Sequence, residues 1–199
     1  VTGVQTCALP ILNYKAVLVG QTKVGKTAIA LKFIQEDNSN PLPTVGVDIL
    51  TKTMNVNGEE VDIAIWDTAG AEEYRSLAPM YYRDSAIAII VYAVDDLSSF
   101  DAVTQWQQEI SQQNLSAVIA IVGNKSDLDE TERKVSFEDG NQLAEELGVD
   151  FFETSALTGS GVSDLFNTLV GKAISKKGPP SSVVVPIKQP EPEQRKKCC

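Results

Sequence analysis

The chain has 199 residues, of which 43% are hydrophobic and 22% charged, a composition typical of one soluble globular domain. Its net charge of −10 at pH 7 argues against nucleic acid as a partner, and no apolar run approaches the ~20 residues that span a bilayer. From Lys172 onward the net charge is positive, with seven Lys/Arg and two Glu, whereas the rest of the chain is acidic. The basic end therefore suits contact with an anionic surface. Three cysteines, two of them adjacent at the terminus, make no disulfide framework and predict a reducing, cytosolic compartment.

The first eleven residues, VTGVQTCALPI, are uncharged and show neither helical nor strand periodicity. They match, in order, one reading frame of a common sequencing-library adapter; a disordered natural extension is the alternative. We therefore predict that residues 1–12 are non-native and exclude them from fold reasoning. Residues 13–175 form the predicted globular domain. Residues 176–199, which are polar and rich in proline, form a predicted flexible membrane tether.

Along the domain, apolar β-rich runs alternate with helix-forming stretches. Five runs are nearly continuous, as expected for strands covered on both faces. They lie at residues 15–20, 61–66, 86–92, 118–123 and 149–152. A sixth run, at about 45–56, leads through Asn57-Gly58 into 61–66, a strong signal for an antiparallel hairpin. Helices are predicted near residues 26–35, 97–113, 137–147 and 162–175. The alternation predicts an α/β fold with a doubly wound, mostly parallel six-stranded sheet and one antiparallel strand.

Residues 20–27, GQTKVGKT, follow the first strand and precede a helix-forming stretch. They match G-x-x-x-x-G-K-[ST], the phosphate-binding loop, in the strand–loop–helix context that this loop requires. The glycines let backbone N–H groups surround a phosphate, Lys26 adds a positive charge, and the Thr27 hydroxyl can ligate Mg²⁺. A chance glycine turn is the alternative, which the context disfavours. The predicted nucleotide-binding residues of this loop are Gly20, Thr22, Lys23, Val24, Gly25, Lys26, Thr27 and Ala28.

Three further polar motifs each follow a predicted strand. In DTAG at 67–70, the Asp67 carboxylate can hold Mg²⁺ through water and a glycine N–H can meet a γ-phosphate. In NKSD at 124–127, the Asp127 carboxylate can accept hydrogen bonds from guanine N1–H and N2–H₂, a donor pair that adenine lacks. In TSAL at 154–157, the backbone can reach the guanine carbonyl. Taken singly, each is readable as an ordinary polar turn. Their order predicts guanine-nucleotide contacts from Asn124, Lys125, Asp127, Ser155, Ala156 and Leu157.

Together these motifs resemble the Ras superfamily of small GTPases and, within it, the Rab family. The Rab-like segments are TVGVD at 44–48, IWDTAG at 65–70 and YRSLAPMYYR at 74–83, and LAPMYYR is similar to the endosomal branch. The resemblance implies a P-loop small GTPase that binds GTP or GDP with Mg²⁺. It also implies a first switch in which Thr44 closes over Mg²⁺ and the γ-phosphate, and a second switch from Ala69 to about residue 83. Mg²⁺ would then be held by Thr27, Thr44 and Asp67.

The family resemblance also implies a surface that effector proteins read, formed by Ile49, Trp66 and Tyr81. Ordinary core packing is the alternative explanation for these side chains, and it fits Trp66 better than Tyr81.

The chain departs from the family at the motif D-T-A-G-Q, where Ala71 replaces the glutamine that orients the attacking water. A methyl group neither donates nor accepts a hydrogen bond, so we expect slow intrinsic GTP hydrolysis at a catalytic centre that keeps Gly70 and Lys26. Rab-directed activating proteins supply a glutamine and an arginine in trans, so assisted hydrolysis can survive. A sequence error or a naturally slow paralogue are the alternatives. Asn38, in place of a base-stacking aromatic, and Leu157, in place of lysine, predict less cover over the base.

The terminal residues 194–199, QRKKCC, resemble the Rab double-cysteine end on which Cys198 and Cys199 each receive a geranylgeranyl group. Two lipid chains give stable anchoring where one gives marginal binding, and the basic residues add about 1 kcal/mol each near an anionic leaflet. A metal or disulfide pair is the alternative. This end implies the cytoplasmic face of intracellular, endosomal membranes, with a soluble cytosolic pool. The implied partners are effectors, an exchange factor, a GTPase-activating protein, and prenylation and membrane-extraction chaperones.

Three functions fit these observations in decreasing order. The first is a membrane-anchored GTP/GDP switch that hydrolyses GTP slowly and regulates vesicle traffic. The second is a GTP-locked scaffold that recruits effectors without useful turnover, which Ala71 keeps open. The third is an ATP-dependent kinase or ATPase, which has the phosphate loop in its favour and NKSD at 124–127 against it.

Overall fold

The computed structural model describes residues 12–35, 46–68 and 78–177. In these residues one six-stranded sheet has the strand order β2-β3-β1-β4-β5-β6. The strands are β1 (Leu12–Val19), β2 (Val47–Val56), β3 (Glu59–Thr68), β4 (Ile87–Ala93), β5 (Val118–Asn124) and β6 (Asp150–Thr154). The helices are α1 (Lys26–Gln35), α2 (Ala78–Tyr82), α3 (Leu97–Asp101), α4 (Val103–Gln113), α5 (Phe137–Leu147) and α6 (Val162–Lys177).

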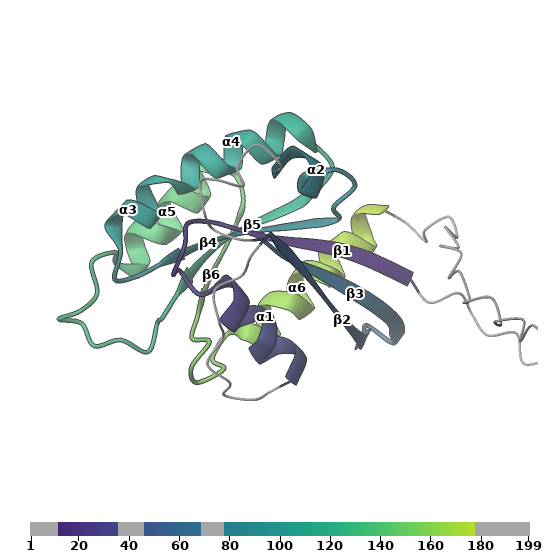
Figure 1. Cartoon of the computed structure of the whole chain (residues 1–199), viewed down its shortest axis with the longest axis horizontal. Helices are drawn as coiled ribbons and strands as arrows, with labels where there is room; N and C mark the ends of the chain where they lie inside the picture. Colours follow the sequence, from purple (N-terminus) through teal and green to yellow (C-terminus); the bar gives the residue numbers. More distant parts are fainter. Residues whose placement is uncertain (1–11, 36–45, 69–77, 178–199) are drawn as a thin grey trace, which may run out of the picture.

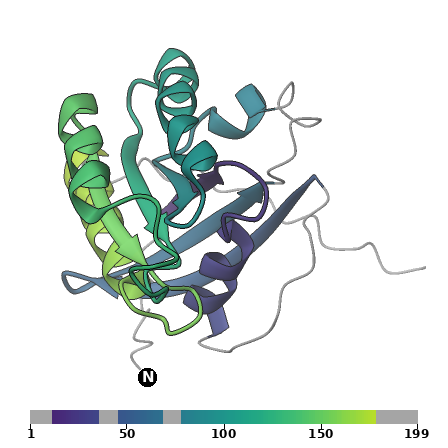
Figure 2. The ribbon, with the colours of Figure 1, turned by 90° about the vertical axis from the view of Figure 1, so that its left-hand side faces the viewer.

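The sheet is mostly parallel, and among the described strands β2 alone runs antiparallel to its neighbour. The turn between β2 and β3 has φ 54° at Asn57 and φ 87° at Gly58. Positive φ at both central residues defines the tight hairpin turn that an Asn-Gly pair favours. The doubly wound α/β fold with one antiparallel strand, which the sequence predicted, is therefore confirmed. Figure 2 shows the long strands β2 and β3 running side by side.

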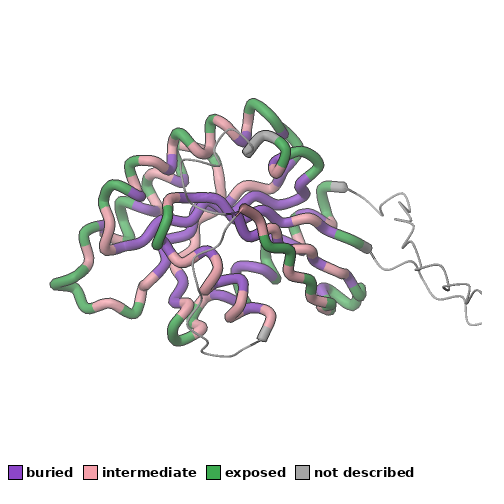
Figure 3. Tube along the Cα trace, viewed as in Figure 1, coloured by how far each residue is buried: buried purple, intermediate pink, exposed green. Residues whose placement is uncertain are grey.

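Helices cover both faces of the sheet, as Figure 1 shows. On one face α1 and α6 pack over a core that includes Phe33 and Phe166, whose rings stack with centroids 3.9 Å apart. On the other face α2, α4 and α5 contribute Tyr82, Val103 and Ala144 to a second core. Figure 3 shows that buried residues follow the central strands. This double covering explains why the central strands read as continuous apolar runs.

Two helical details differ from the sequence expectation. The predicted helix at 97–113 is divided at Ala102 into α3 and α4, although Ala102 itself keeps right-handed angles, with φ −77° and ψ −13°. Near the start of α3, the Ser99 hydroxyl donates to Asp96 O at 2.7 Å and accepts from Ala93 N at 3.0 Å, which ties this short helix to the end of β4. The short helix α2 was not predicted at all.

The helix predicted at 137–147 forms with those bounds. Ser136 accepts a hydrogen bond from Asp139 N at 3.0 Å, which caps the first turn, and Gly148 ends the helix with a left-handed φ of 67°. None of the described helices is both long and apolar enough to cross a membrane.

Candidate nucleotide-binding site

The predicted phosphate loop connects β1 to α1, and its glycines occupy positions that exclude a side chain. Gly20 has φ 136°, and a Cβ there would lie 2.1 Å from Val91 O. Gly25 has φ 97°, and a Cβ there would lie 2.2 Å from Nδ2 of Asn124. The loop passes directly against β4 and the end of β5, which leaves no room for a side chain at either position. Both this lack of space and the backbone conformation therefore require glycine.

Lys26 is held inside this loop and is only 5% exposed. Its Nζ donates to Gly20 O at 2.9 Å and to Gln21 O at 2.8 Å. Burial lowers the pKa of Lys26 to about 8, although the nearby Asp67 carboxylate acts to raise it. An anionic phosphate beside Nζ would favour the charged form. The loop is thus wrapped around a cation that a phosphate can neutralise.

The two predicted metal ligands that the structure describes lie together. Thr27 Oγ1 donates to Asp67 Oδ2 at 2.6 Å, and Asp67 is fully buried. Thr68 fixes the end of β3 by donating to Leu18 O at 2.6 Å. A hydroxyl and a carboxylate oxygen are the hard ligands that Mg²⁺ takes beside nucleotide phosphates, so these residues fit the implied ion. Thr44, Gly70 and Ala71 lie outside the described residues.

Asn124, at the end of β5, connects the phosphate loop to the predicted base-reading loops. It is 2% exposed, and its Nδ2 donates to Val24 O at 2.8 Å, one hundred residues away in the chain. Its Oδ1 accepts from Thr154 Oγ1 and from Ala156 N, each at 3.2 Å. Both polar atoms of its side chain therefore bond to protein atoms, and these bonds join the loop that begins at Asn124 to the phosphate loop and to the loop at 154–156.

Asp127 lies on the protein surface, where Ser155 orients it. Ser155 Oγ donates to Asp127 Oδ1 at 2.5 Å and accepts from Thr158 N at 3.0 Å. Leu157 is 67% exposed. The sequence motifs 124–127 and 154–157 are thus brought together at the carboxyl edge of the sheet, next to the phosphate loop.

Two ion pairs brace this region, and neither was predicted from the sequence. Lys125 Nζ lies 2.9 Å from both carboxylate oxygens of Asp95, which follows β4. Arg133 makes a two-pronged contact with Glu153, at 2.6 Å and 3.0 Å, immediately before Thr154. The partners are 30 and 20 residues apart in the chain, so no local pattern could have revealed them.

The predicted effector-reading residues also come together. Ile49 and Trp66 are directly paired across β2 and β3, and the Trp66 and Tyr81 rings are 6.3 Å apart. Ile49 is 50% exposed, whereas Trp66 and Tyr81 are partly buried against the core. Lys15 Nζ lies 4.0 Å from the centroid of the Trp66 ring. The three side chains are therefore contiguous: Ile49 is exposed, and Trp66 and Tyr81 also pack against the core.

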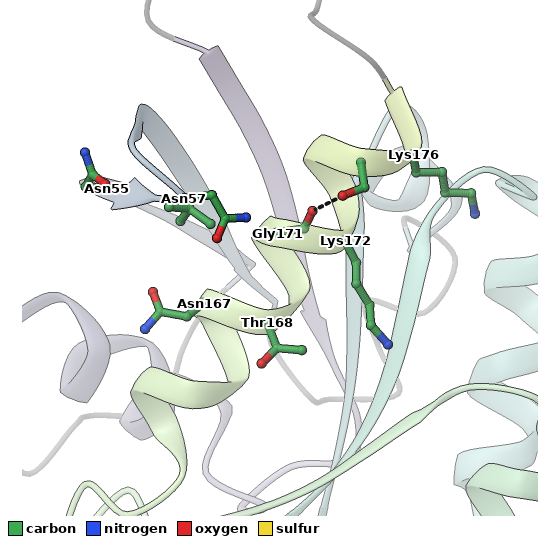
Figure 4. Close-up of a pocket in the computed structure, with 9 residues that line it drawn as sticks. Asn55, Asn57, Asn167, Thr168, Gly171, Lys172 and Lys176 are labelled. Carbon is green, nitrogen blue, oxygen red and sulfur yellow. Dashed lines mark hydrogen bonds between the residues drawn. The ribbon is translucent and has the colours of Figure 1, made fainter.

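A separate cavity of about 760 Å³ lies between the β2–β3 hairpin and α6. Figure 4 shows Asn57 beside Gly171, with Lys172 and Lys176 pointing away from the hairpin. Lys172 pairs with Asp150, and Lys176 donates to Ala117 O at 3.3 Å. This cavity lies beside the β2–β3 turn, at the opposite end of the strands from the predicted nucleotide loops. None of the predicted site residues lines it.

The sheet order, the flanking helices and the loops at the carboxyl edge define the P-loop small GTPase fold. Residues 15–175 match the model of the Ras family. Ras-related protein Rab-17 of Mus musculus is 37% identical over 193 residues, which cover 93% of this chain and 90% of that protein. Ras-related protein Rab5 of Nicotiana tabacum is 39% identical over 193 residues, 94% of this chain and 96% of that protein.

The chain belongs to the Ras family and, within it, to the Rab small GTPases. The family resemblance inferred from the sequence motifs is therefore confirmed. As a Rab protein, the chain is a GTP-binding and GTP-hydrolysing switch of vesicle traffic, and effectors, an exchange factor and a GTPase-activating protein are its partners.

Proposed function

We propose that this chain is a membrane-anchored Rab switch of endosomal traffic in which GTP binds at the carboxyl edge of the sheet and is hydrolysed slowly. The observation that carries the proposal is the position of Asn124. It joins Val24 of the phosphate loop to Ala156 of the base-reading loop by hydrogen bonds of 2.8 Å and 3.2 Å. Phosphate-binding and base-binding groups therefore share one framework.

In this proposal each group of residues has a distinct role. Backbone N–H groups of the phosphate loop and the Lys26 ammonium bind the phosphates. Asp127, oriented by Ser155 at 2.5 Å, accepts the guanine N–H donors. Thr27, Asp67 and Thr44 would hold Mg²⁺, which neutralises charge on the β- and γ-phosphates when bound.

Base selection is tested by GDP binding to the Asp127→Asn variant. An amide in place of the carboxylate presents one donor toward the N1–H and N2–H₂ of guanine, so we expect GDP affinity to fall by at least about tenfold. Asp129→Asn is the matched control, because it removes an exposed acid two residues further along the same loop. Equal GDP affinity in both variants would remove Asp127 from the site.

Slow hydrolysis is proposed from the sequence position of Ala71, where no side chain can orient water. Single-turnover hydrolysis of purified protein with GTP and Mg²⁺ tests it. Ala71→Gln should raise the intrinsic rate about 10-fold or more, because it restores one group that positions the attacking water. An unchanged rate would refute a catalytic deficit at this position.

The second candidate, a GTP-locked effector-binding scaffold, is also favoured by Ala71. Nucleotide analysis of protein purified from cells separates the two functions. Mostly GDP would support a cycling switch, whereas mostly GTP, unaffected by a Rab-directed activating protein, would support the scaffold.

Membrane anchoring through Cys198 and Cys199 is proposed from the terminal QRKKCC alone. Two geranylgeranyl chains give stable attachment, and loss of one leaves marginal binding. Membrane fractionation of the Cys199→Ser and double Cys→Ser variants should show partial and then complete release. Membrane retention of the double variant would refute the lipid anchor, and colocalisation with endosomal membranes tests the proposed organelle.

A further inference from the structure

The segment at residues 94–98, which leads from the end of β4 into the first turn of α3, contacts both halves of the candidate nucleotide site. At its start, Val94 N donates to Asn124 O at 3.0 Å. In its middle, Asp95 pairs with Lys125. At its end, Ser98 exchanges hydrogen bonds with Gln21 of the phosphate loop. No sequence motif marks this connection, so its proximity to the site comes from the fold.

The Asp95–Lys125 pair is well formed. Lys125 Nζ lies 2.9 Å from each carboxylate oxygen, and the two side chains are 34% and 33% exposed. Lys125 has φ 69°, a left-handed conformation that residues with a side chain adopt at a cost. Its carbonyl oxygen accepts from Leu128 N at 3.1 Å, which closes the turn containing Asp127. The ion pair therefore holds the residue on which this turn depends.

The contact to the phosphate loop is a reciprocal hydrogen bond. Gln21 Nε2 donates to Ser98 O, and Ser98 Oγ donates to Gln21 Oε1, each at 3.3 Å. Asp96 fixes the start of α3 by accepting from Ser98 N at 3.1 Å. The same five-residue stretch thus carries one contact to each side of the pocket.

We propose that Asp95 is a positioning residue for guanine-nucleotide binding. Its carboxylate fixes Lys125, and through Lys125 the turn that presents Asp127, so that the base-reading loop is pre-formed and GDP release is slow. The inference deepens the proposed function and depends on residues 124–127 reading the base. An unpaired carboxylate near the nucleotide would have the opposite effect and speed GDP release, because it would repel the phosphates. Pairing with Lys125 balances that charge, so the positioning effect dominates.

The test is the dissociation rate of a fluorescent GDP analogue with Mg²⁺ present, measured for the original protein, Asp95→Asn and Asp95→Ser. We expect about 2- to 5-fold faster release from both variants, the change that a partly exposed ion pair produces. The matched control is Asp96→Asn, which removes a neighbouring negative charge while asparagine still caps α3. Its release rate should stay within about 2-fold of the original.

A double-variant cycle separates positioning from general destabilisation. In a Lys125→Met background, Asp95→Asn should no longer change the release rate, because the partner of the carboxylate is already absent. Raising the salt concentration should speed release from the original protein more than from Asp95→Asn, since only the original has the ion pair to screen.

Unchanged or slower release from the Asp95 variants, or an equal effect of Asp95→Asn in the Lys125→Met background, would overturn the inference while the original protein still retains GDP. Failure of the original protein to retain GDP would instead overturn the proposed function. The two failures are therefore distinguishable in one assay.

Discussion

Strands β4 and β2 belong to the same sheet but bury their residues very differently. Every residue of β4 is buried, whereas β2 is exposed at Asp48 and Ile49 and then alternates between half-buried and exposed positions until Val56. β4 lies between β1 and β5 with helices over both faces, while β2 is an edge strand joined by a hairpin. The difference shows that coverage by neighbouring elements, and not membership of the sheet, sets the apolar pattern of a strand.

The two regions suit two different tasks. In the covered region, Ala93, Asn124 and Thr154 are aligned side by side where β4, β5 and β6 end, so the loops that follow start from a fixed frame. In the hairpin region, Ile49 is directly paired with Trp66 and remains half exposed. A rigid frame favours a small-molecule site, and a half-covered strand leaves side chains for a protein partner.

The largest expected contrast is between two isoleucine truncations. Ile89→Ala removes a fully buried side chain of β4 and should lower the free energy of unfolding by about 2–5 kcal/mol. Ile49→Ala, on β2, should lower it by no more than about 0.5 kcal/mol. Urea unfolding at a fixed GDP and Mg²⁺ concentration measures both, because bound nucleotide adds to apparent stability. Similar losses would contradict the comparison.

The second contrast asks whether burial decides the value of an ion pair. Arg133 and Glu153 have side chains 13% and 15% exposed, whereas Lys172 and Asp150 are 49% and 29% exposed. Arg133→Gln should cost about 1.5–3 kcal/mol, because it leaves a charged hydrogen-bonding partner poorly satisfied. Lys172→Gln should cost at most about 0.5 kcal/mol. The same urea measurement applies, and a larger loss from Lys172→Gln would reverse the conclusion.

The third contrast compares two helical glycines. A Cβ on Gly140 of α5 would lie 2.5 Å from the Tyr92 hydroxyl and 2.6 Å from Phe151, whereas a Cβ on Gly171 of α6 would meet Val56 at 3.7 Å. Gly140→Ala should therefore destabilise by about 1–3 kcal/mol through overpacking. Gly171→Ala should stabilise by about 0.5–1 kcal/mol through helix propensity. Thermal unfolding with GDP bound should give shifts of opposite sign.

The smallest expected effect lies in the hairpin. Thr53 Oγ1 donates to Asp62 Oδ1 at 2.6 Å, and the two residues are directly opposite each other on β2 and β3. Because the bond is exposed to water, Thr53→Val should change the free energy of unfolding by at most about 0.5 kcal/mol. A loss above about 2 kcal/mol in urea unfolding would show that the hairpin is held as tightly as the covered strands.

Local chemistry explains which features could be read in advance. Asn57-Gly58 can adopt positive φ at two successive positions, so it predicted the turn that forms. Gly20 and Gly25 were predicted by motif, and their contacts with Val91 and Asn124 explain why no other residue fits. Each of these signals lies within a few consecutive residues.

Other features depend on residues that are distant in the chain. The motif predicted Asn124 as a nucleotide-binding residue, but it gave no sign that the Asn124 amide joins Val24 to the loop at 154–156. Such contacts require the sheet to be assembled before the partners meet.

By itself, the amino-acid sequence determined the strand and helix pattern, the hairpin and the Rab family, because periodicity and turn chemistry act over short stretches of chain. Only the tertiary structure decided that Asp95 meets Lys125, that Arg133 meets Glu153 and that Asn124 joins three loops. The physical reason is that parallel strands place the ends of distant segments at one edge of a sheet, where hydrogen bonds form between side chains that share no local pattern.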